Sequence, residues 1–386
     1  MCRVLVTDGE TRAALATVRA LGRAGHVVHV SCARARSLAG ASRYAAAEHA
    51  LGDPALAPGD WVAALEELVE RVRPELILPL TEVSLGTLYS FDVPARRPVA
   101  CPSRHAYEAV TDKHDLLQRA SGLGISVPRT LLVERPGALS DLPAPFRYPV
   151  ILKPRRSRWI EDGSWRAGET QVVAGPEALG RVAASPVLAR GALLQEYVPG
   201  HGEGLFLLAS AGRTLVRFAH RRLREKPPTG GVSVLRESIE PDLSLLQASE
   251  SLLRELGWTG VAMVEFRRRP NGEAVLMEVN PRLWGSLQLA IDAGVDFPSL
   301  LVALHRGETL PQVTPSIGVR SRWLLGDLDH LLISLRRPEV RRLTGRSVPG
   351  LLADFLRSFV DGSRPEVLRW DDWRPFLREL RDWLRG

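Results

Sequence analysis

The strongest constraint on this chain is a pair of strands that a tight turn joins and that both carry acidic residues. Residues 261–267 and 277–280 have the pattern of strands, and Asn271-Gly272 between them is a typical hairpin turn. A loop of two or four residues centred on that turn places Glu265 directly opposite Glu278. A three-residue loop with a bulge would instead shift the register by one residue.

The same face of this hairpin carries an amide. Side chains alternate along a strand, so Glu278 and Asn280 point to one side. Like charges that face each other on a sheet are destabilising unless something neutralises them. Because carboxylate and amide oxygens suit a hard cation such as Mg²⁺, Glu265, Glu278 and Asn280 are the candidate metal ligands. The competing interpretation is a solvated hairpin edge with two unrelated glutamates.

Lysine is the second unusual feature, because only three of the 51 basic residues are lysines. We attribute this bias to genome composition. The remaining lysines are therefore candidates for functional roles to which arginine is poorly suited. A compact ammonium suits single phosphate oxygens. Lys153 ends an apolar strand and Lys113 opens a helix, positions from which both reach a bound nucleotide. For each lysine taken alone, a surface position without function is the alternative.

Composition argues against several other classes of protein. The net charge is +7, but acidic and basic residues interleave, so no tail for nucleic acid is apparent. Cys2, Cys32 and Cys101 are odd in number and far apart, which fits a reducing compartment. We find neither a leader segment nor an apolar run long enough to cross a membrane. The sequence thus predicts a cytoplasmic protein with neither nucleic acid nor membrane as a partner.

Strand and helix alternate over the first 110 residues, which predicts a parallel α/β domain. The turn after the first strand, residues 8–11, has a single glycine and lacks the dinucleotide-binding fingerprint. The predicted strands are 3–7, 27–31 and 76–78, and the predicted helices are 11–23 and 61–73.

The remainder is richer in strands and then becomes helical. Residues 223–238 are rich in glycine and proline, and we expect a loop there, with 222–233 as a mobile lid. Apolar residues at helical spacing in 323–332 and 370–384 predict helices that pack on the body, because their acids and arginines are too evenly mixed for a membrane face. The predicted strands are 130–134, 150–153, 170–174, 192–198, 205–211 and 213–220.

The order of these motifs resembles the ATP-grasp superfamily of carboxylate–amine ligases over residues 1 to about 310. The resemblance implies a fold of mixed α/β and α+β class. An N-terminal parallel α/β domain (1–111) would precede an ATP-grasp domain of two α+β subdomains. These would be a small lid subdomain (112–190) and a large subdomain with the metal hairpin (191–315), and a helical C-terminal extension (316–386) would follow.

The resemblance also implies cofactors and their ligands. Glu265, Glu278 and Asn280 would hold two Mg²⁺ ions, with Mn²⁺ as an alternative, against the phosphates of ATP. Arg282 would touch the transferred phosphate. The remaining cofactor-binding candidates are Lys113 and Lys153 for the phosphates and the adenine side, Glu196 and Val198 for the adenine edge, Glu203 for ribose, and Leu276 for the base, where a plain core position competes.

The implied reaction is phosphoryl transfer from ATP to a small-molecule carboxylate, followed by attack of an amine on the acyl phosphate. Lys226 in the lid would join Arg282 and Asn280 as a catalytic candidate. For His220 and Arg221 a capped strand end is an equal alternative. The substrate-binding candidates are His220, Arg221, Gly230, Gly231, Trp284, Gly285 and Ser286.

The chain departs from the family after the second lysine. Residues 154–159 lack the glycines that form an amide nest around phosphate, and the next glycine is Gly163. Either arginine side chains replace that loop, or the lid folds differently. The rival functions are a bicarbonate-using enzyme of the biotin-carboxylase or carbamoyl-phosphate type, a non-catalytic nucleotide-binding regulator, and a basic nucleic-acid-binding protein. A homodimer is the family-level expectation.

Overall fold

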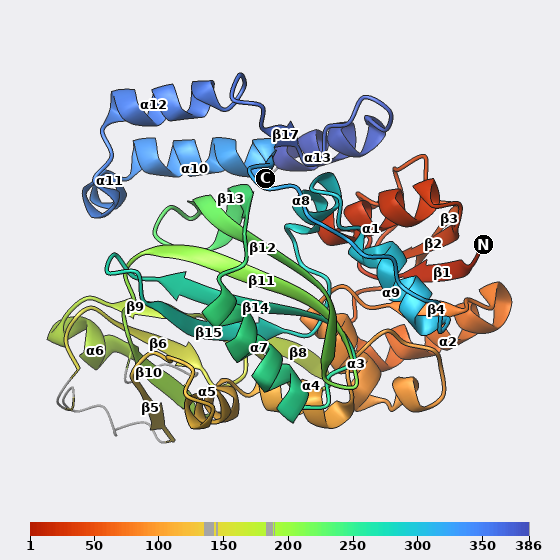
Figure 1. Cartoon of the computed structure of the whole chain (residues 1–386), viewed down its shortest axis with the longest axis horizontal. Coiled ribbons are helices and arrows are strands. Elements are labelled where there is room, and N and C mark those ends of the chain that lie inside the picture. Colours follow the sequence, from red (N-terminus) through yellow and green to blue (C-terminus); the bar gives the residue numbers. More distant parts are fainter. Residues whose placement is uncertain (135–142, 144–145, 183–187, 189, 386) are drawn as a thin grey trace.

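Four sheets organise the part of the chain that the computed structural model describes, residues 1–134, 143, 146–182, 188 and 190–385. Figure 1 shows the N-terminal sheet on one side, a small sheet on the other, and a large sheet between them. Helices near the C-terminus lie along one border of the large sheet.

The N-terminal sheet is parallel, with strand order β3-β2-β1-β4. Thr11 begins the first helix by accepting a hydrogen bond from the Ala14 amide. The predicted parallel α/β fold of this region is confirmed. Its elements are β1 (Arg3–Val6), α1 (Arg12–Arg23), β2 (Val27–Cys32), β3 (Ala47–Ala50), α2 (Pro58–Val72), β4 (Leu76–Leu78), α3 (Glu82–Ser90), η1 (Val93–Ala95) and α4 (Arg104–Thr111).

The small sheet is antiparallel, with strand order β5-β10-β6-β9. Since β10 pairs here, this sheet extends past residue 190, the proposed end of the small subdomain. A two-stranded hairpin, β7 and β8, occupies the segment where family members have the glycine-rich loop, and Gly163 lies in its turn at φ +73°. The elements are α5 (Lys113–Gly122), β5 (Thr130–Val133), β6 (Val150–Pro154), β7 (Arg158–Glu161), β8 (Ser164–Ala167), β9 (Gln171–Val173), α6 (Pro176–Val182) and β10 (Ala192–Glu196).

The large sheet has the order β15-β14-β11-β12-β13-β16-β17. Its first five strands are antiparallel neighbours, and the hairpins β11-β12-β13 and β14-β15 are joined by a crossover through α7. The elements are β11 (His201–Ser210), β12 (Arg213–Lys226), β13 (Val232–Ile239), α7 (Leu243–Glu255), β14 (Gly260–Arg268), β15 (Ala274–Asn280), α8 (Leu287–Asp292), α9 (Phe297–His305), β16 (Arg320–Arg322) and β17 (Arg364–Pro365).

The predicted lid at 222–233 and loop at 223–238 are wrong. Strands β12 and β13 run through this segment and pair as far as Lys226 and Val232, which leaves only residues 227–231 as a turn. The prolines and glycines that suggested a loop are the turn itself, at Pro227-Pro228 and Gly230-Gly231. Residues 233–238 of β13 are buried, Val234 completely, which favours a strand on this side of the turn.

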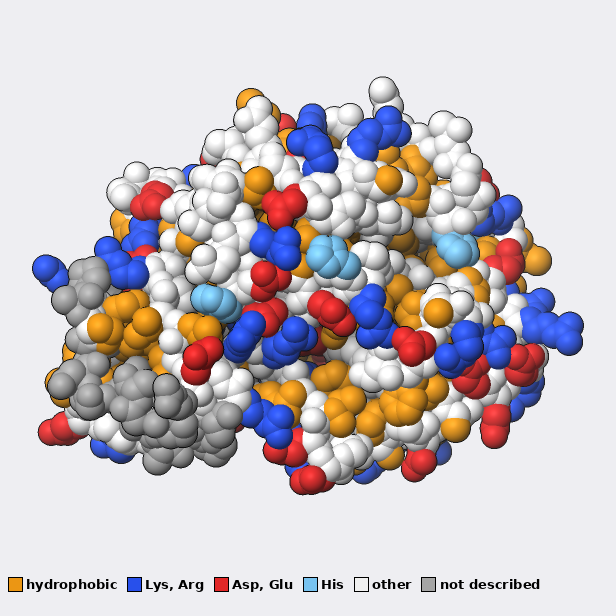
Figure 2. Space-filling view, turned by 90° about the horizontal axis from the view of Figure 1, so that it is seen from below, with side chains coloured by type: hydrophobic (Ala, Val, Ile, Leu, Met, Phe, Trp, Pro, Cys, Tyr) orange, Lys and Arg blue, Asp and Glu red, His pale blue; other side chains and the backbone are white. Residues whose placement is uncertain are grey.

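The C-terminal extension is helical, as predicted, and comprises α10 (Leu324–Arg336), α11 (Pro338–Thr344), α12 (Val348–Arg357) and α13 (Arg374–Arg385). Trp370 and Trp373 precede the last helix instead of lying in it, and Trp370 is 92% exposed. No helix in the described ranges is long and apolar enough to cross a membrane. Acidic and basic side chains are interleaved across the face seen in Figure 2.

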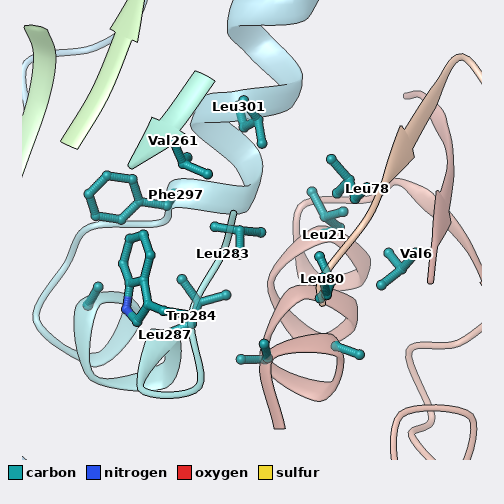
Figure 3. Close-up of a cluster of buried hydrophobic side chains, with 14 of the residues drawn as sticks. Val6, Leu21, Leu78, Leu80, Val261, Leu283, Trp284, Leu287, Phe297 and Leu301 are labelled. Carbon is teal, nitrogen blue, oxygen red and sulfur yellow. The ribbon is translucent and has the colours of Figure 1, made fainter. Parts of the chain in front are cut away.

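Two cores cover the two faces of the large sheet. One core joins this sheet to the N-terminal domain, where Trp284 and Phe297 lie near Leu21 and Leu78 (Figure 3). The other core packs α4, α5 and α7 against the opposite face and includes Phe266. Because alternate residues of β14 enter different cores, the face of every charged residue on this strand is defined.

Candidate active site

The two hairpin glutamates face each other, as predicted. Glu265 on β14 is the register partner of Glu278 on β15. The register shifts by one residue just beyond this pair, because Phe266 is opposite Leu276 and Met277 forms a bulge. The Asn280 amide donates to Glu278 Oε1 at 3.1 Å and to Glu265 Oε1 at 3.3 Å. The three candidate metal ligands therefore lie together.

The environment shifts the pKa values of the two glutamates in opposite directions. Burial and the facing Glu278 raise the pKa of Glu265 to about 7, although its ion pair with Arg222 acts in the opposite direction. Burial also acts to raise the pKa of Glu278, but Lys113, the Asn280 amide and Lys153 lower it overall. Two buried carboxylates are thus held side by side by surrounding cations.

Both predicted lysines lie on the side of Glu278. Asp112 caps α5 and accepts from Arg155 Nε at 2.8 Å, which holds the start of this helix against the end of β6. As a result, Lys113 donates to Ser157 Oγ, and Lys153 is only 7% exposed. Burial and the neighbouring Lys113 lower the pKa of Lys153 to about 8.

The donor set fits Mg²⁺ when phosphate completes its shell. No group of three His, Cys, Asp or Glu side chains gathers for a metal within the described residues. Two carboxylates and one amide supply only part of an octahedral oxygen shell, which Mg²⁺ usually fills with phosphates and water. A cavity of about 30 Å³ adjoins the ligands and is lined by residues that include Lys113, Ser157, Glu278, Asn280 and Arg282.

The predicted adenine residues lie at the end of β10. The Glu196 carboxylate accepts from the Arg129 amide at 3.1 Å and from Arg269 Nη2 at 2.7 Å. The Val198 carbonyl accepts from Arg267 Nε at 3.0 Å. Since Arg267 shares the face of Glu265, this contact connects the predicted adenine hinge with the metal hairpin.

Two predicted nucleotide residues are not brought to this face. Glu203 is the register partner of Phe266, so its side chain lies on the face opposite Glu265, where it pairs with Arg268 at 2.8 Å. Leu276 is completely buried in the core beside Phe266, because the bulge turns it away from Glu278. Single-residue alternation and the bulge account for both placements.

The predicted substrate residues separate into several environments. His220 is buried 3.5 Å from Ser286 Oγ, and burial, with Arg222 and Arg236 nearby, lowers its pKa well below the ordinary value. Trp284 stacks against Phe206 in the core and therefore does not line a pocket.

Four more predicted positions lie elsewhere. Arg221 is on the opposite face, paired with Glu237 at 2.6 Å. Lys226 pairs with Asp329 of α10. Gly230 and Gly231 form the β12–β13 turn, in which the Gly231 carbonyl accepts from Arg222 at 3.1 Å. Lys226 is therefore held by the C-terminal helices, away from a lid role.

Sequence reasoning missed two arginines of the site. Arg222 pairs with Glu265 and lies 3.1 Å from Glu225, and Arg267 binds the hinge carbonyl. The signal for both was present, since period-two alternation places Arg222 on the face of His220 and Arg267 on the face of Glu265.

A second, larger cavity of about 840 Å³ lies beyond the hairpin. Arg282 lines both this cavity and the small one, and Gly285 is the predicted substrate residue that borders it. Its walls come from the carboxyl ends of the N-terminal strands, the β7 strand and the C-terminal helices. The charged residues among them are Asp8, Glu10, Arg12, Asp53, Glu82, Arg158, Arg282, Glu379 and Asp382.

Several solved structures share this architecture. The biotin carboxylase domain dimer of 2-oxoglutarate carboxylase from Hydrogenobacter thermophilus, in complex with MgADP, ADP and bicarbonate, matches with a TM-score of 0.64 and 15% identity, over 82% of this chain and 73% of that chain. N5-carboxyaminoimidazole synthetase from Staphylococcus aureus, complexed with ADP, matches with a TM-score of 0.66 and 13% identity, over 88% and 86%. L-amino acid ligase from Bacillus licheniformis matches with a TM-score of 0.61 and 14% identity, over 82% and 78%.

These likenesses show that the chain has the ATP-grasp fold, which confirms the predicted resemblance and fold class. Within that fold, residues 189–325 match the model of a family described as ATP-grasp in the biosynthetic pathway with Ter operon. No curated protein sequence matches the chain.

Proposed function

We propose that this chain is an ATP-dependent ligase that joins a carboxylate to an amine through an acyl phosphate and releases ADP and phosphate. The observation that carries the proposal is the place of Arg282, which lines both the small cavity beside Glu278 and the large cavity. A phosphoryl group bound near Glu278 would thus be within reach of a substrate in the large cavity.

Charge complementarity supports ATP and Mg²⁺ as the cofactors. Glu265, Glu278 and Asn280 would hold the ion, which when bound neutralises phosphate charge. Lys113 and Lys153 border the same acids and would bind phosphate oxygens as point charges. Glu196 and Val198 remain our candidates for the adenine edge, since Arg267 ties that hinge to the hairpin.

The reaction would proceed in two balanced steps. A carboxylate oxygen attacks the γ-phosphorus, and the bond from that phosphorus to the bridging oxygen breaks, which releases ADP. Arg282 would bind the transferred group and offset the charge that develops. The amine nitrogen then attacks the acyl carbon, phosphate leaves, and the amine loses a proton. The buried setting of the glutamates helps to exclude water from the acyl phosphate.

The relatives divide between two substrates. The likeness to an L-amino acid ligase favours a carboxylate and an amine, while the carboxylase domain with bicarbonate favours the alternative of bicarbonate as the phosphoryl acceptor. We further propose a homodimer, as in that carboxylase domain. The three cysteines are free thiols, which supports a cytoplasmic protein.

Nucleotide product analysis tests the proposal. Purified protein is incubated with Mg-ATP and pools of carboxylates and amines, beside a Glu278→Ala variant, and the nucleotides are separated by chromatography. We expect ADP and phosphate that depend on both pools and that disappear in the variant. AMP with pyrophosphate would refute the acyl phosphate. ADP formation with bicarbonate alone would favour the alternative, and ATP binding without any turnover would indicate a regulator.

A further inference from the structure

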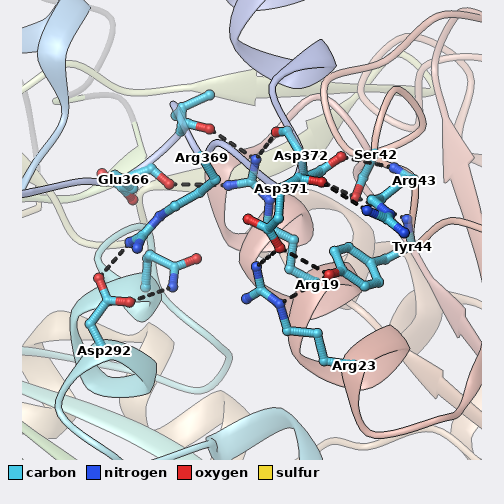
Figure 4. Close-up of polar contacts among 12 residues, drawn as sticks. Arg19, Arg23, Ser42, Arg43, Tyr44, Asp292, Glu366, Arg369, Asp371 and Asp372 are labelled. Carbon is cyan, nitrogen blue, oxygen red and sulfur yellow. Dashed lines mark hydrogen bonds and ion pairs between the residues drawn. The ribbon is translucent and has the colours of Figure 1, made fainter.

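The last part of the chain, residues 364–385, runs along the N-terminal domain, and we call it the C-terminal arm. Figure 4 shows Arg19 of α1 at the centre of this contact. Arg19 donates to Asp372 Oδ2 at 2.8 Å and to the carbonyls of Asp372, Val367 and Glu366 at 2.7, 2.9 and 3.2 Å. Both side chains of this ion pair are 1% exposed. The arm is therefore fixed to α1.

Glu366 of the arm joins two arginines from different elements. Its carboxylate accepts from Arg12 of α1 at 2.6 Å and pairs with Arg236 of β13. Arg236 is completely buried, and Glu366 is 2% exposed. Two guanidinium groups around one carboxylate leave an excess of one positive charge at this point.

Arg12 lines the large cavity, so the excess positive charge borders that cavity. Its guanidinium lies 3.8 Å from the centre of the Trp323 ring, so Glu366 and Trp323 together fix its direction. Among the described residues, Arg12 Nη2 makes no hydrogen bond. Arg12 Nη2 is 3.5 Å from where a Cβ on Gly285 would lie, three residues after Arg282.

Glu379, a second acid whose pKa Arg12 influences, offsets only part of this charge. Glu379 of the arm accepts from Trp323 Nε1 at 2.7 Å, and burial raises its pKa to about 7. Arg12 is thus paired with Glu366 on one side, and its Nη2 is left without a hydrogen bond among the described residues.

We propose that Arg12 binds a carboxylate group of the substrate in the large cavity and that Glu366 of the C-terminal arm positions Arg12 for this contact. The arm, which lies entirely beyond the segment that matches the family model, is then part of the substrate site. This inference rests on the proposed function for the identity of the reaction, although carboxylate binding can be measured without turnover.

Steady-state kinetics, with the carboxylate that the nucleotide product analysis identifies, distinguishes the binding role of Arg12 from the positioning role of Glu366. Arg12→Gln should raise KM for the carboxylate about tenfold to a hundredfold, the range for a lost hydrogen bond to a charged group, and leave KM for ATP within about twofold. Glu366→Gln should raise the same KM by a smaller factor. Arg12→Lys, which keeps the charge, should recover part of the loss.

Arg23→Gln is the matched control, because Arg23 lies on the same helix and pairs with Asp371 of the arm at 2.7 Å, outside the cavity. We expect its KM values to be unchanged. An unchanged carboxylate KM in Arg12→Gln would overturn the inference. So would a parallel loss of kcat, ATP affinity and melting temperature in both cavity variants, since that pattern marks a purely structural network.

A thermal-shift assay distinguishes failure of this inference from failure of the proposed function. The probes are the twenty amino acids and a set of small dicarboxylates, without ATP. A shift that Arg12→Gln loses and Glu278→Gln keeps supports the carboxylate site even if no ADP is formed, in which case only the proposed reaction fails. No shift with any probe, together with no carboxylate-dependent turnover, overturns the inference.

Discussion

Two of the charge clusters in the described part of the chain are built in opposite ways. At the hairpin, Glu265 and Glu278 face each other as like charges, and cations from three other segments surround them. At the arm, Arg19 and Asp372 are opposite charges in direct contact, and the backbone carbonyls of the arm take up the other guanidinium donors.

The comparison separates stability from function. The Arg19–Asp372 pair is satisfied within the protein and holds two ends of the chain together. The hairpin cluster is frustrated, since its acids repel each other and one of them binds protons readily near neutral pH. Such a cluster gains most when an external cation and phosphates arrive.

Removing one partner of the arm pair should have the largest effect. Asp372→Ala leaves Arg19 buried without its counter-charge, so we expect a loss of about 3–5 kcal/mol in the free energy of unfolding, measured with urea. Asp371→Ala is the control, because the Arg23–Asp371 pair is more than a third exposed and should contribute at most about 1 kcal/mol. Equal losses in the two variants would remove the distinction between the clusters.

Substitution of a hairpin glutamate should affect catalytic activity more than stability. Glu278→Gln should lower kcat by about 10²–10³, comparable to losing one group that stabilises a transition state. Its stability should change by only about 1 kcal/mol, since the substitution removes the repulsion from Glu265 together with the attraction of Lys113 and Lys153. Glu67→Gln, at an exposed position of α2, should change neither quantity. A hairpin variant that unfolds as easily as Asp372→Ala would contradict this account.

Glu379 provides a test through the pH dependence of stability, with an expected effect of intermediate size. Its pKa in the folded protein, about 7, is above its ordinary value of 4.5. Between about pH 4.5 and 7 the unfolded chain loses this proton while the folded protein keeps it, so stability falls as pH rises through that window. The loss is complete above pH 7 and reaches at most about 3 kcal/mol.

Glu379→Gln removes this penalty and can still accept from Trp323 through its amide oxygen. We expect a higher melting temperature than the parent at pH 8 and little difference at pH 5, measured by scanning calorimetry. The reverse order, with the gain at pH 5, would show that Glu379 is ionised in the folded protein.

The smallest effect should come from Trp370. It is a large apolar residue of the arm, but it is 92% exposed and lies outside the buried contacts. Trp370→Ala should therefore change the free energy of unfolding by less than about 0.5 kcal/mol. A larger loss, measured with urea, would mean that the arm is held by more than its buried ion pairs.

The hairpin could be predicted from sequence because its ligands are close together in the chain. The Asn-Gly turn and the strand alternation predict Glu265 opposite Glu278, although in the structure the turn pairs Arg268 with Ala274 and the bulge at Met277 restores this pairing. The same alternation fails one residue on, because no sequence signal marked the bulge at Met277 that sends Leu276 to the core. Composition gives a wrong prediction at the β12–β13 segment, because the prolines and glycines of a five-residue turn indicate a long loop.

The arm could not be predicted in this way. Arg19 and Asp372 are 353 positions apart, and neither residue lies in a recognisable motif. Among 48 arginines, nothing in the sequence distinguishes those that are fully buried, such as Arg19 and Arg236. Pairings of this kind depend on how complete domains meet, and local patterns carry no information about that.

The arm also affects the order in which the chain folds. Helix α1 is synthesised early, but the counter-charge of Arg19 emerges from the ribosome some 350 residues later. Until then, burying Arg19 would cost several kcal/mol. We therefore expect the side of α1 that carries Arg19 to stay exposed to solvent until the arm is synthesised. Nascent chains stalled before residue 372 should therefore be more sensitive to protease within α1 than chains released just after it.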